Sequence, residues 1–354
     1  MKWTLESIEA NLLGTSSEVV AYGPDVIVAA VNRVEEFLGT GWIQQETFGA
    51  KGLAVGVPII QIGIELELLK GVKRPSELIT KIRSNTQNAR TELAAIHLLR
   101  SQQPSAEVEL YPPVGNRKAD FRIRLSGAPW TTVEVTNPSD SEALRNLRRM
   151  AGDLAQKLAT VDHSFSLEVL LTREPSQNEL RVLSVRLPEF CRMNSVQHAI
   201  LNNELGYLFL NDIEVGQVMG HDLPGTRPAP LIGVMLLVGG LGGRPVRQIS
   251  VRIPFTDQRA ATILKNEARQ LPKGGIGVVM IEVSNAPGSL NAWVPLLKRR
   301  FGPALNTRIS GVSLFKRTMG HSDGRYSIET ESSLIANPYA AQKLPQWIEA
   351  ALAN

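Results

Sequence analysis

The first 85 residues carry apolar side chains mostly at the three- and four-residue spacing of a helix. The run VIVAAVNRVEEFL begins after Pro24 and ends at Gly39, and a second run, IGIELELLKGVK, ends near Pro75. Proline at the start of such a run and glycine at its end are ordinary helix boundaries. We therefore expect residues 1–85 to form a helical N-terminal region that could serve as an oligomer interface, a partner dock or a lid.

The hydrophobic pattern changes from residue 86 onward. The predicted elements are, in order, a helix, three short alternating strands, a helix and a strand, over residues 89–100, 107–111, 118–125, 131–136, 141–158 and 166–172. Turn-forming pairs rich in proline, glycine and asparagine separate them. Residues 86–175 are thus expected to be one core, a mixed sheet with helices packed on it.

Residues 176–354 continue as α/β. Strands are expected within 230–238, 248–254, 277–284, 309–315 and 326–330, with helices between them near 256–271 and 292–300. This C-terminal extension could either lengthen the first sheet or form a second domain, and the pattern does not choose.

Two acids lie on the expected hairpin of residues 117–137. Alternate side chains of a strand point to opposite faces, so Asp120 shares a face with Lys118 and Arg122, away from the apolar positions. Glu134 lies on the polar face of the next strand, and pairing around the SGAPW turn would bring it beside Asp120. Two such carboxylates are the minimum that holds a magnesium ion against a phosphate. An exposed antiparallel hairpin with ordinary surface acids has the same pattern.

A third acid, Glu92, lies within the apolar stripe of the preceding helix, among Ala89, Ile96 and Leu99. A buried carboxylate is costly unless a cation, a metal or a hydrogen bond compensates it. Glu92 could support a metal site with the hairpin acids, or it could form a salt bridge with a nearby arginine.

The helix expected after the hairpin has a cationic side. Arg145 and Arg149 lie together, off the apolar stripe of that helix. Such a face beside a carboxylate pair could contact a phosphodiester backbone. An exposed arginine-rich helix surface is also common.

In order and residues, this core resembles the restriction-endonuclease-like fold of the PD-(D/E)XK phosphodiesterase superfamily. The family core is helix, three strands, helix, strand, with an acid on the first helix, aspartate on the second strand and Glu-x-Lys on the third; Glu92, Asp120 and Glu134-Val135-Thr136 stand in those places. The resemblance implies that Asp120 and Glu134 bind Mg²⁺ or Mn²⁺, with Glu92 in support and the Val135 carbonyl as a further ligand.

By the same resemblance, the chain would hydrolyse phosphodiester bonds in DNA, with Arg122, Arg145 and Arg149 contacting the nucleic acid. The sequence departs from the family at Thr136, where the family has a lysine that helps to position or deprotonate water. Lys118 could take this role from the strand of Asp120. Otherwise the chain would be a catalytically inactive nucleic-acid-binding or protein-interaction module on the same fold.

Composition excludes several other classes of site. The single cysteine, Cys191, excludes an intramolecular disulfide and a cysteine-based zinc site, and the five histidines have no zinc spacing. The start of the sequence has no secretory signal pattern, and the longest apolar stretch, 231–238, is far too short for a bilayer. We expect a cytoplasmic protein without a membrane partner.

The net charge of +4 is unevenly distributed along the 354 residues. Residues 1–50 carry two basic and seven acidic side chains, whereas residues 51–124 carry twelve basic and seven acidic ones. Residues 283–321 carry six basic side chains and no acidic one. This asymmetry suits a surface that faces nucleic acid, although runs of charge also simply solvate a face.

Overall fold

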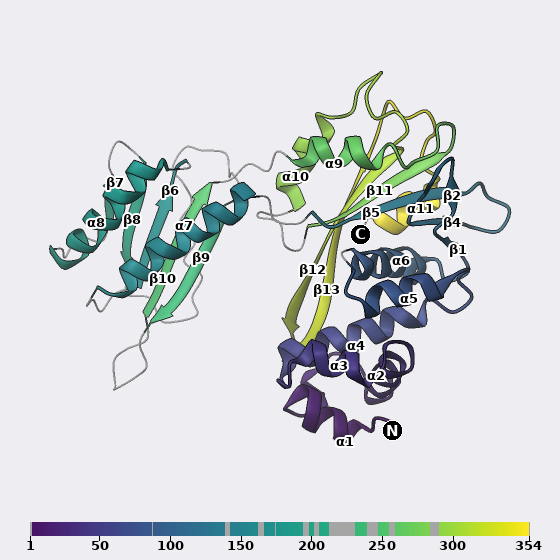
Figure 1. Cartoon of the computed structure of the whole chain (residues 1–354), viewed down its shortest axis with the longest axis horizontal. Coiled ribbons are helices and arrows are strands. Elements are labelled where there is room, and N and C mark those ends of the chain that lie inside the picture. The colour runs from purple at the N-terminus through teal and green to yellow at the C-terminus, as the bar shows by residue number, and fades with distance from the viewer. Residues whose placement is uncertain are drawn as a thin grey trace. The chain divides into compact units, whose positions relative to one another are not determined.

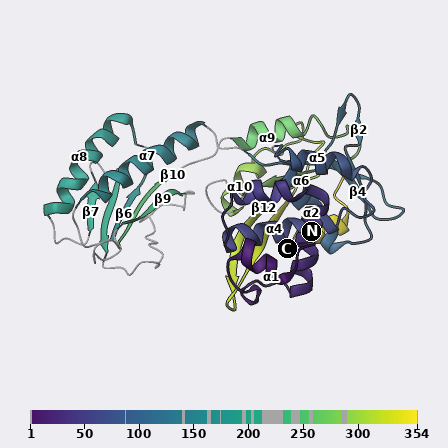
Figure 2. The same cartoon turned by 60° about the horizontal axis from the view of Figure 1, so that its bottom comes forward.

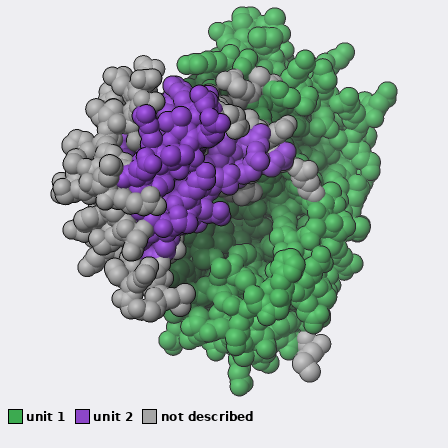
Figure 3. Space-filling model, turned by 60° about the vertical axis from the view of Figure 1, so that its left-hand side comes forward, with its two compact units in different colours: residues 1–138, 259–285, 293–354 green, residues 139–258, 286–292 purple. Residues whose placement is uncertain are grey.

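A computed structural model gives the structure of the chain in two compact units (Figure 3). It describes residues 2–86, 88–138, 142–161, 166–173, 175–193, 198–201, 205–211, 231–238, 247–254, 259–283 and 290–353. The first unit comprises residues 1–138, 259–285 and 293–354, and the second comprises 139–258 and 286–292. The chain therefore leaves the first unit after Pro138, inside the expected core of residues 86–175.

The N-terminal part of the first unit is helical, as the sequence predicts. Pro24 lies in the first turn of α2, and Gly39 ends that helix with a φ of +91°, which a residue with a Cβ rarely adopts. The helical elements are α1 (Leu5–Ile8), η1 (Glu9–Leu13), η2 (Ser17–Val19), α2 (Pro24–Leu38), α3 (Thr40–Thr47), α4 (Leu53–Glu67), α5 (Pro75–Arg83) and α6 (Ala89–Gln102).

A six-stranded mixed sheet forms the centre of the first unit (Figure 1). Its strands lie in the order β1 (Glu107–Leu110), β4 (Phe121–Arg124), β5 (Thr131–Thr136), β11 (Ile276–Glu282), β12 (Gly311–Ser322) and β13 (Arg325–Ala336). The β5–β11 and β11–β12 pairs are parallel and the other pairs are antiparallel. Two short strands, β2 (Pro113–Val114) and β3 (Arg117–Lys118), pair beside it. The mixed sheet and the hairpin around SGAPW are as predicted.

The helix and strand that complete this sheet are not the predicted ones. The helix expected over 141–158 and the strand expected over 166–172 exist as α7 (Glu142–Ala159) and β6 (Ser166–Leu171), but both belong to the second unit. There β6 pairs with β8 and β10. Their places in the first unit are taken by α9 (Arg259–Glu267) and by β11, which runs parallel to β5 with Val279 opposite Glu134. Residues 86–175, which the sequence pattern predicts to be one core, are therefore divided between the two units.

Helices cover both faces of the first sheet (Figures 1 and 2). The N-terminal helices and α11 (Gln346–Leu352) share one buried core with Val133 and Val135 of β5 and with Met280 of β11. The helices α9 and α10 (Leu290–Lys298) lie on the other side. Because alternate residues face opposite sides, Thr132 and Glu134 point away from that N-terminal core.

The second unit has a sheet of its own, in the order β7 (His198–Leu201), β8 (Gly206–Asn211), β6, β10 (Arg247–Pro254) and β9 (Leu231–Val238). The apolar stripe of α7, including Leu147 and Leu154, packs on this sheet together with α8 (Gln177–Met193). The C-terminal half thus supplies strands both to this sheet and to the first one. Among the described helices, none is long and apolar enough to span a membrane.

Candidate functional site

Asp120, directly before β4, lies against β5. The register pairs Phe121 with Val133 and Arg122 with Thr132, and continuing it sets Asp120 opposite Glu134. At Asp120 the chain turns toward β1, because the Asp120 carbonyl accepts a hydrogen bond from the Tyr111 N–H (2.9 Å). On the other side, the side-chain oxygen Oδ2 of Asp120 accepts a hydrogen bond from the Val135 N–H of β5 (2.7 Å). The Asp120 carboxyl group is thereby fixed beside Glu134.

Three of the predicted acids lie together. The carboxyl groups of Asp120 and Glu134 are close enough to share a hydrogen bond when one of them is protonated. Glu134 is 1% exposed and Glu92 is 4% exposed, whereas Asp120 is half-buried. The Glu134 Oε1 is buried without a hydrogen-bond partner in the described part of the chain. A buried carboxyl oxygen without a partner calls for a donor or a cation.

Burial and mutual repulsion hold protons on this cluster. Burial, followed by the charges of Asp120 and Glu267, raises the pKa of Glu134 to about 10. Burial raises the pKa of Asp120 to about 6 against the opposing effects of the Val135 N–H and Lys81, and burial with the Asp120 charge raises the pKa of Glu92 to about 7. Neighbouring carboxylates cannot all ionise at low cost unless a positive charge joins them.

Among the described residues, Lys81 on α5 is the cation that contacts the cluster. Its Nζ lies 3.5 Å from Glu92 Oε1 and 3.8 Å from the centroid of the Tyr111 ring. The Tyr111 hydroxyl donates to Glu92 Oε2 (2.6 Å). The sequence prediction missed both residues. Lys81 carries no motif and reaches Glu92 only because α5 packs on α6.

Lys118, which was expected to supply this charge, is directed elsewhere. Its Nζ lies 3.5 Å from Glu77 Oε2, and its side chain is 59% exposed. No described hydrogen bond or ion pair joins it to Asp120 or Glu134. Lys118 belongs to the short β2–β3 ribbon and not to β4, which begins at Phe121. The structure brings Glu92, Asp120 and Glu134 together and leaves Lys118 apart from them.

A fourth acid, Glu267, comes from α9 and was also missed. Burial raises its pKa, and its charge acts on both Glu134 and Asp120. No pattern near the hairpin could have indicated it, because more than a hundred residues of the second unit lie between β5 and α9.

The described side chains near Asp120 and Glu134 offer few ligands to a divalent ion. Within the described ranges, no three or more histidine, cysteine, aspartate or glutamate side chains are arranged to hold a metal ion. The available ligands are two carboxyl groups, through the Asp120 oxygen that does not bind Val135 and through the unpartnered Glu134 Oε1. Mg²⁺ is commonly held by one or two carboxylates and retains several waters. Asp120 and Glu134 would be the ligands of such an ion, with Glu92 beside them, and this metal site stays a prediction.

The predicted nucleic-acid contacts are dispersed. Arg122 donates to Glu109 Oε2 from Nε (3.0 Å) and Nη2 (2.6 Å), and its guanidinium lies 4.4 Å from the Trp130 ring centroid. Arg145 and Arg149 are exposed on α7, in the second unit. Their contact with nucleic acid stays a prediction.

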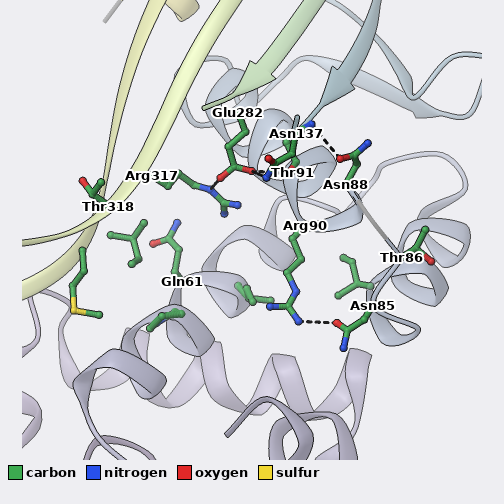
Figure 4. Close-up of a pocket in the computed structure, with 15 residues that line it drawn as sticks. Gln61, Asn85, Thr86, Asn88, Arg90, Thr91, Asn137, Glu282, Arg317 and Thr318 are labelled. Atoms are coloured by element: carbon green, nitrogen blue, oxygen red, sulfur yellow. Dashed lines mark hydrogen bonds and ion pairs between the residues drawn. The ribbon is translucent and has the colours of Figure 1, made fainter. Parts of the chain in front are cut away.

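A second group of buried polar residues lines a cavity of about 480 Å³ in the first unit (Figure 4). Glu282, at the end of β11, accepts from Arg317 Nε (2.8 Å) and from the Thr91 hydroxyl (2.6 Å). Arg317 Nη1 also lies 3.4 Å from Glu65 Oε1. Glu282 thus has a cation and a donor in contact, unlike Glu134.

Comparisons with family models, with curated proteins and with solved structures found no match to this chain.

Proposed function

We propose that this protein is a nuclease-like phosphodiesterase that depends on Mg²⁺ or Mn²⁺ and acts on DNA. The observation that carries the proposal is the pair Asp120 and Glu134: two acids on neighbouring strands, close enough to share a proton, with a buried Glu134 oxygen that has no partner among the described residues. Carboxylates so placed gain most from a divalent ion between them.

The order of elements supports the same proposal. The first unit contains α6, β1, β4, β5, α9 and β11 in the sequence helix, three strands, helix, strand. Glu92 lies on the first helix, Asp120 directly before the second strand and Glu134 on the third. This agrees with the restriction-endonuclease-like arrangement, provided that the second unit is an insertion between the third strand and the second helix.

The ion, when bound, would polarise the scissile phosphate and lower the pKa of water. Asp120 and Glu134 would hold it, and the Val135 N–H would keep the Asp120 carboxylate turned toward β5. Glu92, fixed by Tyr111 and Lys81, would orient water at the edge of the pair. Lys81 would contribute the positive charge that Thr136 cannot carry.

A catalytically inactive binding or interaction module is the second candidate, and specific contacts favour it. Asp120 already has a structural role, because its carboxylate accepts the Val135 N–H just before β4 begins. Thr136 replaces the usual lysine, and Lys118 pairs with Glu77. A protein that kept the fold and lost the chemistry would show these features.

Cleavage of plasmid and single-stranded DNA in Mg²⁺ or Mn²⁺ separates the two candidates. We expect Asp120→Asn and Glu134→Gln to lose activity by about a hundredfold or more, since each removes a ligand charge. Glu107→Gln is the matched control, because Glu107 pairs with Arg124 at the strand surface, with 41% of its side chain exposed. Activity that survives in both site variants refutes the assignment. Absence of cleavage in the wild type, with salt-sensitive binding retained, establishes the binding module.

A further inference from the structure

A groove of about 600 Å³ lies in the first unit, beside the start of β5. Four of the residues that line it are basic (Arg122, Arg269, Lys273 and Arg308), one is Trp130, and none is acidic. We call it the basic groove. Its residues come from β4, β5, the segment after α9 and the segment before β12, so widely separated parts of the chain bring positive charge to one place.

Three of these cations are not neutralised within the described part of the chain. Arg269 and Lys273 are exposed and Arg308 is half-buried, and none of the three forms a described ion pair or side-chain hydrogen bond. Arg122, by contrast, is bound to Glu109. A concave surface with an excess of positive charge attracts an anionic ligand.

Two segments that line the basic groove pack closely against the backbone of Gly277 in β11. This residue lies opposite Thr132, which lines the groove. A Cβ on Gly277 would lie 2.6 Å from the Arg308 carbonyl oxygen and 2.8 Å from a methyl group of Leu271. The missing side chain lets the segments that carry Arg308 and Leu271 close over the sheet. The groove is therefore part of the packed fold.

The lining also contains an aromatic ring, that of Trp130. Trp130 lies with its ring centroid 4.4 Å from the Arg122 guanidinium and 4.3 Å from that of Arg124. Prolines 112, 113 and 272 add apolar surface. Cations next to an aromatic ring are how proteins hold single strands, since phosphates contact the cations while bases contact the ring.

The basic groove adjoins the candidate site along one strand. Thr132 and Glu134 point to the same face of β5, and two residues of a strand span roughly 7 Å. A nucleic-acid strand bound in the basic groove would thus pass close to Asp120 and Glu134. Arg145 and Arg149, the cations expected from the sequence, are not needed for this path.

We propose that the basic groove binds a single strand of nucleic acid, with phosphates on Arg269, Lys273 and Arg308 and a base against Trp130. The proposal rests on the proposed function insofar as the bound strand is the one presented to Asp120 and Glu134. A duplex keeps its bases stacked inside and could not place one against Trp130 without flipping it out.

The test is fluorescence anisotropy with labelled oligothymidine in metal-free buffer, where no cleavage occurs. The variant Arg269→Ala/Lys273→Ala/Arg308→Ala is compared with Lys2→Ala/Lys51→Ala/Arg325→Ala, which removes equal charge from exposed positions lining no part of the groove. Each phosphate contact on a single strand contributes about 0.7 to the dependence of log K on log salt. We expect the groove variant to lower that slope by about 2 and to weaken binding about tenfold or more, and the control variant to change neither comparably.

Trp130→Leu should weaken oligothymidine binding by about tenfold without changing the salt slope, because it removes stacking and no charge. The groove proposal is overturned if the groove variant binds like the wild type, if the control loses as much, if a duplex binds more tightly than the single strand, or if the wild type binds neither at low salt. The charge variant replaces two exposed side chains and the half-buried Arg308 and leaves Trp130 in place, so it remains informative if Trp130→Leu does not fold.

Cleavage assays distinguish this failure from failure of the proposed function. Glu134→Gln should bind oligothymidine like the wild type and lose cleavage by about a hundredfold or more. A wild type that cleaves while the groove variant still binds normally refutes the groove alone. Binding that depends on the groove, in a protein that cleaves no DNA with any metal, refutes the nuclease proposal and supports the groove.

Discussion

Two groups of buried acids share the first sheet and differ in how their charge is neutralised. At Glu282, Arg317 lies between two carboxylates, and Thr91 donates a further hydrogen bond. At Glu134, the neighbouring acids repel one another, and the described ion pair of Lys81 is with Glu92. Both acids are almost fully buried on adjacent strands. Burial alone therefore does not mark a functional acid; an acid without a described cation in contact is the better candidate.

The largest expected effect tests the neutralised group. Arg317→Met would leave Glu65 and Glu282 buried without their shared cation, and breaking a buried pair in this way costs about 3 kcal/mol or more. We expect urea denaturation near neutral pH to show a free energy of unfolding lower by that amount. Arg325→Met, at an exposed position of the β12–β13 hairpin, should change it by less than about 0.5 kcal/mol. Equal stability of the two variants would mean that Arg317 is not what stabilises its two acids.

A smaller effect of opposite sign is expected at Glu134. Its pKa is about 10 in the folded chain against 4.5 for an ordinary glutamate. The folded state therefore retains a proton on Glu134 that the unfolded chain releases. The contribution of this proton to the free energy of unfolding is full below about pH 4.5 and is lost as the pH rises toward 10. In metal-free buffer near pH 8, Glu134→Gln should be about 1–3 kcal/mol more stable than the wild type.

Glu282→Gln is the matched variant for this prediction, since it removes a buried carboxylate that has a cation. It should be less stable than the wild type near pH 8. Urea denaturation at several pH values measures both. The comparison between the two groups fails if Glu134→Gln, like Glu282→Gln, is less stable than the wild type at high pH. It also fails if the excess stability of Glu134→Gln over the wild type does not shrink as the pH falls toward about 4.5.

The smallest expected effect is the difference in stability between variants of Lys81 and of Lys118. Lys81 contacts Glu92, which is 5% exposed in its side chain, whereas Lys118 and Glu77 are 59% and 42% exposed. Lys81→Met should therefore lower the free energy of unfolding by about 1 kcal/mol near neutral pH, and Lys118→Met by less than about 0.5 kcal/mol. Thermal denaturation compares them. A larger loss for Lys118→Met would show that the acids depend on the β3 lysine that the sequence favours.

The sequence predicted the part of the site that lies within one hairpin and its preceding helix. Strand alternation placed Asp120 and Glu134 together, and helical spacing placed Glu92 in a buried stripe, because both are local consequences of backbone geometry. Lys81 and Glu267 depend on helix packing and on a chain return from the second unit, which periodicity does not encode. The stripe of α7 was assigned to the wrong sheet for the same reason: an amphipathic helix shows that it packs, but not on what.

The central claim, that Asp120 and Glu134 hold a divalent ion, is tested most directly by titrating Mn²⁺ and recording the free ion by electron paramagnetic resonance. We expect the wild type to bind Mn²⁺ at a site for which Mg²⁺ competes. Asp120→Asn and Glu134→Gln should each weaken that binding by about tenfold or more, equivalent to about 1.4 kcal/mol, whereas Glu282→Gln should retain it. A wild type that binds no Mn²⁺, or site variants that bind it as tightly as the wild type, would contradict the claim.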